Sequence, residues 1–138
     1  IYRMLIRTKR DDISVSFQNK QKFWEGRTIR PDLVITKNQN GKIDTYVIDT
    51  KWKVLDVTRP EPSDDDLKQM YTYNLYWNAN KSLLLYPSSR PIEERFGNYW
   101  KGRGLNELNQ CKIGFADVLD KNLQLNFDVG NQILSKLF

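Results

Sequence analysis

Histidine is absent from this chain of 138 residues, and its absence excludes more chemistry than any other feature of the composition. Ser-His-Asp and Cys-His catalytic arrangements need the imidazole as a base, and histidine-ligated zinc sites need it as a ligand. Acid–base or metal chemistry must therefore use Asp, Glu, Lys, Tyr and backbone oxygens. Carboxylate oxygens select hard cations such as Mg²⁺, Mn²⁺ and Ca²⁺.

Cysteine and long apolar segments are scarce as well. Cys111 stands alone, which excludes an internal disulfide framework and cysteine-rich zinc or iron–sulfur sites. We expect it to be a small buried core residue. No apolar run approaches the roughly 20 residues of a membrane-spanning helix, and the first residues lack the apolar core of a signal peptide. We therefore expect a cytoplasmic protein with no membrane partner.

The remaining composition is typical of one folded domain. Hydrophobic residues make up 39% and charged residues 28% of the chain, which is enough apolar material for one core. The 22 Lys and Arg residues outnumber the 17 Asp and Glu residues, and the formal net charge is +5. Because the chain starts with Ile, we interpret residues 1–138 as a single domain from a longer protein whose N-terminal part is missing.

Hydrophobic spacing predicts a mixed sheet flanked by helices. Strands are predicted over residues 13–18, 28–36, 43–54, 82–86 and 112–118. Helices are predicted within residues 1–10, from 64 to 76 or 77, and over 131–138, whereas residues 87–110 are expected to be mostly loop. This order is typical of an α/β or α+β fold.

Two local signals mark a turn and a helix start. The dipeptide Asn40-Gly41, between two apolar runs, predicts a type I′ hairpin turn because both residues tolerate positive φ. Ser63 is the expected N-cap of the following helix, and the aspartates at 64–66 occupy its first turn, where the helix dipole favours negative charge. Asp66 also stands at the third position of an arrangement that resembles a capping box.

The predicted hairpin brings two carboxylates together. If Asn40 and Gly41 are the loop residues, paired positions sum to 81, so Asp32 lies opposite Asp49 with side-chain bases about 5 Å apart. Lys51 is two residues after Asp49 and shares its face of the strand. Like charges opposite each other destabilise a strand pair, so this arrangement needs a compensating cation.

Phosphodiester hydrolysis is the chemistry that this cluster favours. Lys51 supplies part of the compensating charge, and a divalent metal ion between the carboxylates and a substrate phosphate could supply the rest. Lys51 could then orient or deprotonate the attacking water, or stabilise the developing charge. The alternative is that Asp32 is a strand-end residue after Pro31, and that Asp49 and Lys51 belong to an ordinary exposed strand face.

Three motifs resemble those of a known superfamily. Pro31-Asp32 is followed after sixteen residues by Asp49-Thr50-Lys51, and residues 69–73 read Gln-Met-Tyr-Thr-Tyr. This pattern resembles the PD-(D/E)XK nuclease superfamily and the Q-h-x-x-Y motif of its RecB-like branch. The context over residues 29–86 is most similar to McrC, the nuclease subunit of McrBC-type modification-dependent restriction systems. The resemblance implies a PD-(D/E)XK restriction-endonuclease-like core, a mixed β-sheet flanked by helices.

The resemblance also implies a role for each matching residue. The protein would be a metal-dependent DNA endonuclease that uses Mg²⁺, which Mn²⁺ can replace. The metal ligands would be Asp32, Asp49 and the backbone carbonyl of Thr50. Lys51 would be the catalytic lysine, and Gln69 and Tyr73, four residues apart and therefore on one helix face, would contact the substrate or support the metal site.

Double-stranded DNA and a second subunit are the partners that the resemblance implies. McrC-type subunits work with a GTP-hydrolysing AAA+ subunit of the McrB type, and no G-x-x-x-x-G-K-[ST] phosphate loop occurs in this chain. Basic residues interleaved with aromatic ones suit contact with phosphates and bases. The candidate DNA-binding residues are Arg30, Lys53, Arg95, Lys101 and Arg103. The loop that carries the last three could instead contact the partner subunit.

Two other interpretations remain open at this point. The chain could be a catalytically inert PD-(D/E)XK-like DNA-binding or assembly module, although intact Asp32, Asp49 and Lys51 argue against this. It could also be a different RecB-like nuclease, such as a helicase-linked one. The iron–sulfur varieties are excluded because they need four cysteines and the chain has one.

Overall fold

The computed structural model describes residues 1–8, 10–52, 61–87, 94–101, 108–117, 121–122 and 124–138. The helices in these residues are α1 (Tyr2–Arg7), α2 (Asp64–Tyr76) and α3 (Val129–Leu137). The strands are β1 (Ile13–Phe17), β2 (Gln21–Trp24), β3 (Arg27–Ile29), β4 (Leu33–Gln39), β5 (Lys42–Thr50), β6 (Lys81–Pro87), β7 (Phe96–Asn98) and β8 (Gln110–Ala116).

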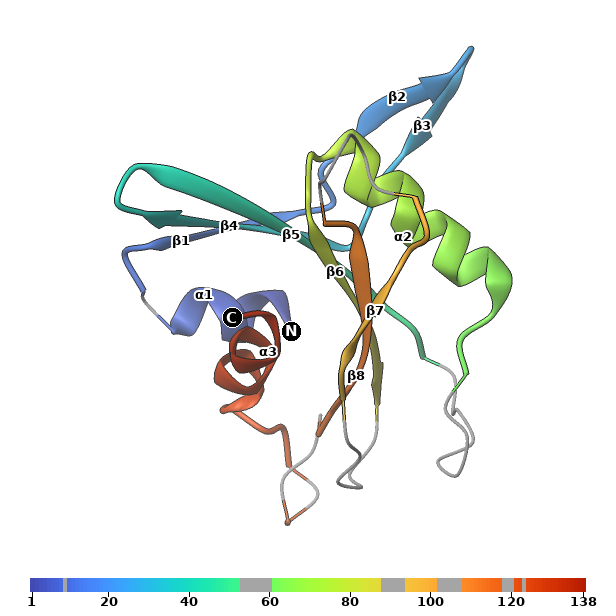
Figure 1. Cartoon of the computed structure of the whole chain (residues 1–138). Helices are drawn as coiled ribbons and strands as arrows, with labels where there is room; N and C mark the ends of the chain where they lie inside the picture. Colours follow the sequence, from blue (N-terminus) through green and yellow to red (C-terminus); the bar gives the residue numbers. More distant parts are fainter. Residues whose placement is uncertain (9, 53–60, 88–93, 102–107, 118–120, 123) are drawn as a thin grey trace.

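Six strands form one mixed sheet in the order β1-β4-β5-β6-β8-β7. The pairs β1–β4, β4–β5 and β7–β8 are antiparallel, whereas β5–β6 and β6–β8 are parallel. Helix α2 covers one face of the sheet, and α1 and α3 lie together on the other (Figure 1). Strands β2 and β3 form a separate hairpin outside this sheet. The predicted mixed sheet flanked by helices, an α+β arrangement, is confirmed.

Alternation along the two central strands builds a core on each face. On β5, Val47 packs with α2, whereas its neighbour Ile48 packs with α1 and α3. On β6, Leu84 faces α2 and Leu83 faces the other pair of helices. Successive side chains of a strand point to opposite faces, so each strand contributes to both cores. Cys111 belongs to the α2 core and is 6% exposed, as expected.

The predicted hairpin turn at Asn40-Gly41 is confirmed. Both residues have positive φ, 54° and 85°, which a type I′ turn requires and which glycine adopts without steric cost. The predicted register follows, because Val34 pairs with Val47 and Leu33 with Ile48. The ladder between β4 and β5 ends at Leu33, so Asp32, which is predicted to face Asp49, lies one residue beyond it.

The cap of helix α2 is also confirmed. The Ser63 hydroxyl accepts a hydrogen bond of 3.1 Å from the backbone N–H of Asp66, and the aspartates at 64–66 form the first turn. The helix ends at Tyr76, within the predicted range. Helix α1 lies within the predicted residues 1–10, and α3 begins two residues before the predicted residue 131.

Helices α1 and α3 pack closely side by side (Figure 1). A Cβ atom on Gly130 would lie 2.6 Å from the backbone oxygen of Met4. Only glycine permits this approach, so the absence of a side chain at residue 130 sets the distance between the two helices. No helix among the described residues is long and apolar enough to cross a membrane.

Some strand predictions need correction, and two short strands are additional to those predicted. The strand predicted over 28–36 is two strands, β3 and β4, because Pro31 has no N–H for a ladder and the chain leaves one hairpin there to enter the main sheet. Strand β2 and the three-residue strand β7 were not predicted, because their short segments show no apolar alternation. The strand predicted over 43–54 ends at Thr50, and residues 53 and 54 lie outside the described residues.

Candidate active site

The ammonium group of Lys51 is the centre of a polar cluster under helix α2. Its Nζ lies 2.7 Å from Oδ2 of Asp49 and 3.3 Å from Oδ1 of Asp66. It also donates a hydrogen bond of 3.1 Å to Oε1 of Gln69. A lysine ammonium has three donors, and each of them has an acceptor here. The side chain is consequently held in one position.

Two short sequence spacings bring these groups together. Asp49 and Lys51 are two residues apart at the end of β5, so both point toward the face that α2 covers. Asp66 and Gln69 are three residues apart on α2, so both point toward the strand. The helix is held over this face by Met70, which is fully buried against Val47 and its neighbours.

Asp32 lies beside this cluster, directly before the first residue of β4. Its Oδ2 accepts a hydrogen bond of 2.8 Å from the backbone N–H of Thr50 and one of 2.6 Å from the Thr50 hydroxyl. Its backbone oxygen accepts a hydrogen bond of 3.1 Å from the N–H of Gln18 on the neighbouring turn. The carboxylate is therefore fixed against Thr50 at the end of β5, next in sequence to Asp49, the residue that the hairpin register predicts opposite Asp32.

Gln69 and Tyr73 connect Lys51 to the segment before Asp32. The Gln69 amide nitrogen donates a hydrogen bond of 3.1 Å to the Tyr73 hydroxyl, which donates one of 3.2 Å to the backbone oxygen of Arg30. Burial, followed by the negative charge of Asp49, raises the pKa of Tyr73 to about 12. The hydroxyl thus stays protonated at neutral pH and keeps its donor role in this chain of hydrogen bonds.

The charges of the cluster influence one another strongly. Burial raises the pKa of Asp49, the hydrogen bond from Lys51 opposes this shift, and the nearby charge of Asp32 adds to it. Burial works against the charged form of Lys51, but its contacts with Asp49 and Asp66 raise the pKa of the amine above its ordinary value. Lys51 is therefore an ammonium at neutral pH, surrounded by more acidic groups than it can neutralise.

This donor set fits a hard cation if other oxygens complete it. Among the described residues, no three or more His, Cys, Asp and Glu side chains are grouped so that they could hold a metal ion by themselves. Asp32 and Asp49 offer two carboxylates, and the excess negative charge favours a cation. Mg²⁺ commonly takes one or two carboxylates and fills its other positions with water and substrate oxygens. The backbone carbonyl of Thr50 is a further oxygen of the required type.

Asp66 and Tyr86 are two residues near the site that sequence reasoning did not identify. The sequence indicates only a helix-cap role for Asp66, yet its carboxylate contacts Lys51. Its spacing of three residues from Gln69 was the signal that could have revealed this. The Tyr86 hydroxyl is buried and has no hydrogen-bond partner within the described part of the chain. Burial and then the charge of Asp66 raise the pKa of Tyr86 to about 12.

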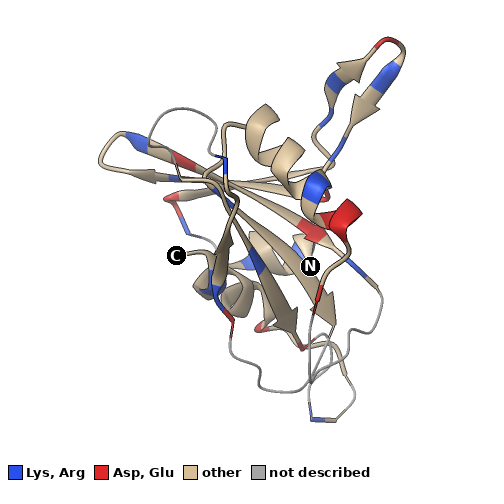
Figure 2. Ribbon diagram, turned by 45° about the vertical axis from the view of Figure 1, so that its right-hand side comes forward, with Lys and Arg blue, Asp and Glu red and all other residues tan. Residues whose placement is uncertain are grey.

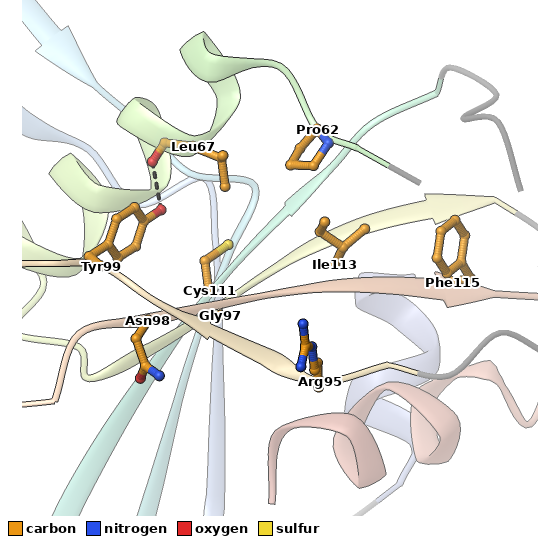
Figure 3. Close-up of a pocket in the computed structure, with 9 residues that line it drawn as sticks. All are labelled: Pro62, Leu67, Arg95, Gly97, Asn98, Tyr99, Cys111, Ile113 and Phe115. Carbon is orange, nitrogen blue, oxygen red and sulfur yellow. Dashed lines mark hydrogen bonds between the residues drawn. The ribbon is translucent and has the colours of Figure 1, made fainter. Parts of the chain in front are cut away.

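The predicted DNA-binding residues are spread over the molecule. Arg30 is exposed two residues before Asp32. Arg95 lies with Leu67 and Tyr99 around a separate cavity of about 510 Å³ between α2 and strands β7 and β8 (Figure 3). The Tyr99 hydroxyl closes one side of it by donating a hydrogen bond of 2.6 Å to the Leu67 backbone oxygen. Lys101 is exposed. Lys53 and Arg103 lie outside the described residues.

These features define a class of protein: an α+β domain whose mixed sheet gathers acidic residues and a lysine at the end of an interior strand. Residues 1–87 match the family described as McrBC 5-methylcytosine restriction system component. The chain belongs to this family, and the predicted relationship to McrBC-type systems is confirmed at this level.

A solved structure shares the fold. A chain of the assembly of Thermococcus gammatolerans McrB AAA+ hexamers with bound McrC superposes with a TM-score of 0.65 at 18% sequence identity. The superposition covers 98% of this chain and 30% of that chain, so the present chain spans about a third of its length. Among curated proteins, no sequence matches this chain.

Proposed function

We propose that this chain is the cleavage part of a McrC-like subunit, a Mg²⁺-dependent endonuclease that hydrolyses double-stranded DNA. The observation that carries the proposal is the ion pair of 2.7 Å between the Lys51 ammonium and Asp49, with the Asp32 carboxylate close enough to Asp49 to raise its pKa. The three residues stand in the order and spacing of a PD-(D/E)XK core. Membership of the McrBC restriction family supports a role in DNA cleavage.

Asp32, Asp49 and the backbone carbonyl of Thr50 would hold the metal ion. When bound, Mg²⁺ or Mn²⁺ supplies polarisation of the scissile phosphate and lowers the pKa of a coordinated water. The hydrogen bonds that Asp32 accepts from Thr50 use one of its oxygens, Oδ2. The second carboxylate oxygen of Asp32 then provides the lone pairs for a ligand contact.

The remaining residues position the lysine. As an ammonium, Lys51 stabilises the negative charge that develops on the phosphoryl oxygens during hydrolysis. Asp66 and Gln69 hold its Nζ from the helix side, and Tyr73 orients the Gln69 amide so that its oxygen faces the ammonium. Such fixed charges are effective because they do not have to reorganise as the reaction proceeds.

The partner that we propose is a GTP-hydrolysing AAA+ subunit of the McrB type. The solved structure that shares this fold contains McrB AAA+ hexamers with bound McrC. Residues 1–138 contain no Gly-rich nucleotide loop, so GTP hydrolysis would come from outside this domain. The present chain would then cut DNA that the partner delivers.

An inert assembly module is the competing function, and the burial of the cluster disfavours it. Asp49 is 6% exposed although it is charged and stands near a second carboxylate. Burying charges costs folding free energy, which replacement by packed apolar residues would avoid. A site that retains this cost is expected to bind a ligand there.

A metal titration tests the proposal without requiring the partner subunit. We expect calorimetry with Mn²⁺ or Mg²⁺ and a short DNA duplex to show saturable binding for the wild type and none for Asp49→Ala. Asp44→Ala, on the same strand beside Lys42, is the matched control and should bind like the wild type. Identical traces for wild type and Asp49→Ala would contradict the metal site and favour the inert module.

A further inference from the structure

The hairpin of strands β2 and β3 contributes no residue to the cluster around Lys51. It projects from the body of the molecule as a two-stranded arm (Figures 1 and 2). Trp24 near its tip is 64% exposed and Phe23 is 48% exposed. Large aromatic surfaces in water are unfavourable and often mark contact sites. Their position on a projecting element leaves them accessible to another molecule.

The arm also concentrates positive charge. Residues 20–30 contain four basic residues and one acidic residue, a net charge of +3 within a chain whose total is +5. Figure 2 shows basic residues on both strands and acidic colour at the tip. All four basic residues are exposed, and none forms an ion pair with another described residue. The basic residues are Lys20, Lys22, Arg27 and Arg30.

The base of the arm is attached to the candidate active site. Gln21 donates a hydrogen bond of 3.0 Å from its amide nitrogen to the backbone oxygen of Tyr76, and the Phe23 and Tyr76 rings lie 5.7 Å apart. These contacts fix the arm to the C-terminal end of α2. Directly after β3, the Tyr73 hydroxyl donates a hydrogen bond to the backbone oxygen of Arg30, two residues before Asp32. The direction of the arm is therefore set relative to the site.

We propose that the β2–β3 hairpin is a DNA-binding arm that holds duplex DNA at the entrance to the site. The proposal rests on the proposed function, because it takes the same substrate. Lys22 and Arg27 contact phosphates, and Trp24 contacts the sugars or bases of the groove. A two-stranded ribbon fits the major groove of B-form DNA. The exposed cations complement a polyanion.

A protein partner fits this arm less well than DNA does. Protein interfaces are depleted of lysine relative to the rest of the surface, whereas the arm presents Lys20 and Lys22 next to its aromatic residues. Docking onto protein would also require acidic groups to pair with each cation as it loses water. Phosphates are spaced regularly along a duplex and meet this requirement without a dedicated partner surface.

A charge-reversal experiment on the full-length protein tests the arm. The double variant Lys22→Glu/Arg27→Glu should bind a fluorescently labelled duplex at least tenfold more weakly in metal-free buffer, measured by anisotropy. The plot of log affinity against log salt concentration has a negative slope, and this slope should become shallower by about 2 because two phosphate contacts are lost. Lys42→Glu/Lys121→Glu changes two other exposed lysines by the same total charge and should remain within twofold of the wild type.

A second variant separates the aromatic contact of Trp24 from the charge of the arm. Trp24→Ala should weaken duplex binding about fivefold or more while leaving the salt dependence unchanged, since an aromatic contact releases no counterions. Trp24→Phe should recover part of the affinity. Because Trp24 is largely exposed, both proteins should unfold at the wild-type temperature, which thermal unfolding checks.

Three results would overturn the arm. The first is that Lys22→Glu/Arg27→Glu binds duplex DNA with the affinity and salt dependence of the wild type. The second is that this double variant no longer binds the AAA+ partner although its DNA affinity is unchanged. The third is that the wild-type chain does not bind duplex DNA. The metal titration tests the proposed nuclease site independently of this DNA-binding assay. If DNA affinity depends on Lys22 and Arg27 but no metal binds, the role of the arm is supported and the proposed nuclease activity is contradicted.

Discussion

The two faces of the central sheet are built by the same strands but differ in the side chains that they bury. Toward α1 and α3, the strands contribute apolar residues such as Ile48, Leu83 and Leu85, all at most 3% exposed. Toward α2, β5 contributes Val47 and then Asp49, and the apolar core gives way to a charged cluster. One face therefore stabilises the fold, whereas the other carries buried charge that costs stability and serves the site.

Two lysines show how strongly the surroundings determine the pKa of a side chain. Lys51, on the α2 face, lies among carboxylates that raise its pKa despite burial. Lys112, on β8, packs near the end of α3, where it donates a hydrogen bond of 3.0 Å to the Lys136 backbone oxygen. Burial lowers the pKa of Lys112, Glu94 opposes the shift, and the charge of Lys136 adds to it. Identical side chains thus acquire opposite shifts in proton affinity on the two sides of one sheet.

Removal of apolar volume from the α1–α3 face should have the largest effect on stability. Ile48→Ala deletes a fully buried side chain, which we expect to lower the free energy of unfolding by about 2–5 kcal/mol. Ile43→Ala on the same strand is the control, because Ile43 is 64% exposed and should lose about 0.5 kcal/mol or less. Denaturant unfolding measures both. Equal losses in the two variants would remove the distinction between core and surface on this strand.

Removal of the lysine from the α2 face should affect activity more than stability. Lys51→Met should lower the rate of DNA cleavage with the AAA+ partner at least about 100-fold, the typical cost of losing a group that stabilises transition-state charge. Lys42→Met is matched to it, since Lys42 also neighbours an aspartate two residues away on β5, at 3.9 Å. Its rate should equal that of the wild type. A Lys51→Met protein that cleaves at the wild-type rate would contradict the assigned role.

Two buried tyrosines of the α2 core allow a finer test of its polar groups. Tyr73→Phe removes a hydroxyl with hydrogen bonds to Gln69 and Arg30 and should cost about 1 kcal/mol. Tyr86→Phe removes a hydroxyl that has no hydrogen-bond partner among the residues that the structure describes, and it should leave stability unchanged or raise it by about 1 kcal/mol. Thermal and denaturant unfolding compare them. A loss of stability in Tyr86→Phe would mean that its hydroxyl does have a partner in solution.

The smallest expected effect is the pH dependence that Lys112 introduces. Because its folded pKa is lowered, the native protein releases this proton at a lower pH than the unfolded chain. Between the folded value and the ordinary lysine value of about 10.4, the unfolded chain binds more protons, so stability rises with pH. Wild type should gain less than about 1 kcal/mol relative to Lys112→Gln in this alkaline window. Parallel stability curves for the two proteins would show that Lys112 has no shifted pKa.

Local chemistry makes several elements predictable. The turn at Asn40-Gly41 needs positive φ at two successive residues, so this dipeptide is sufficient to locate the hairpin and its register. The Ser63 hydroxyl satisfies a backbone N–H that no helical residue can reach, so the start of α2 is equally visible in the sequence. By extension of the hairpin register, the sequence also places Asp32 next to the end of β5.

Other features depend on contacts between distant segments. Asp66 reads as a helix-cap residue, and only the path of α2 across β5 brings its carboxylate to Lys51. The division of residues 27–39 into β3 and β4 follows from pairing with two different partners. Apolar alternation describes one strand at a time and contains no information on which neighbour it will pair with.

The sequence by itself determined the turn, the helix cap, the strand faces and the spacing of the candidate residues, because these depend on interactions within a few residues. Only the tertiary structure decided which groups surround Lys51, that the Tyr86 hydroxyl is buried, and that the β2–β3 arm starts from the site. These depend on the relative positions of segments up to 55 residues apart, as between Gln21 and Tyr76. Such positions are set by the packing of the whole core.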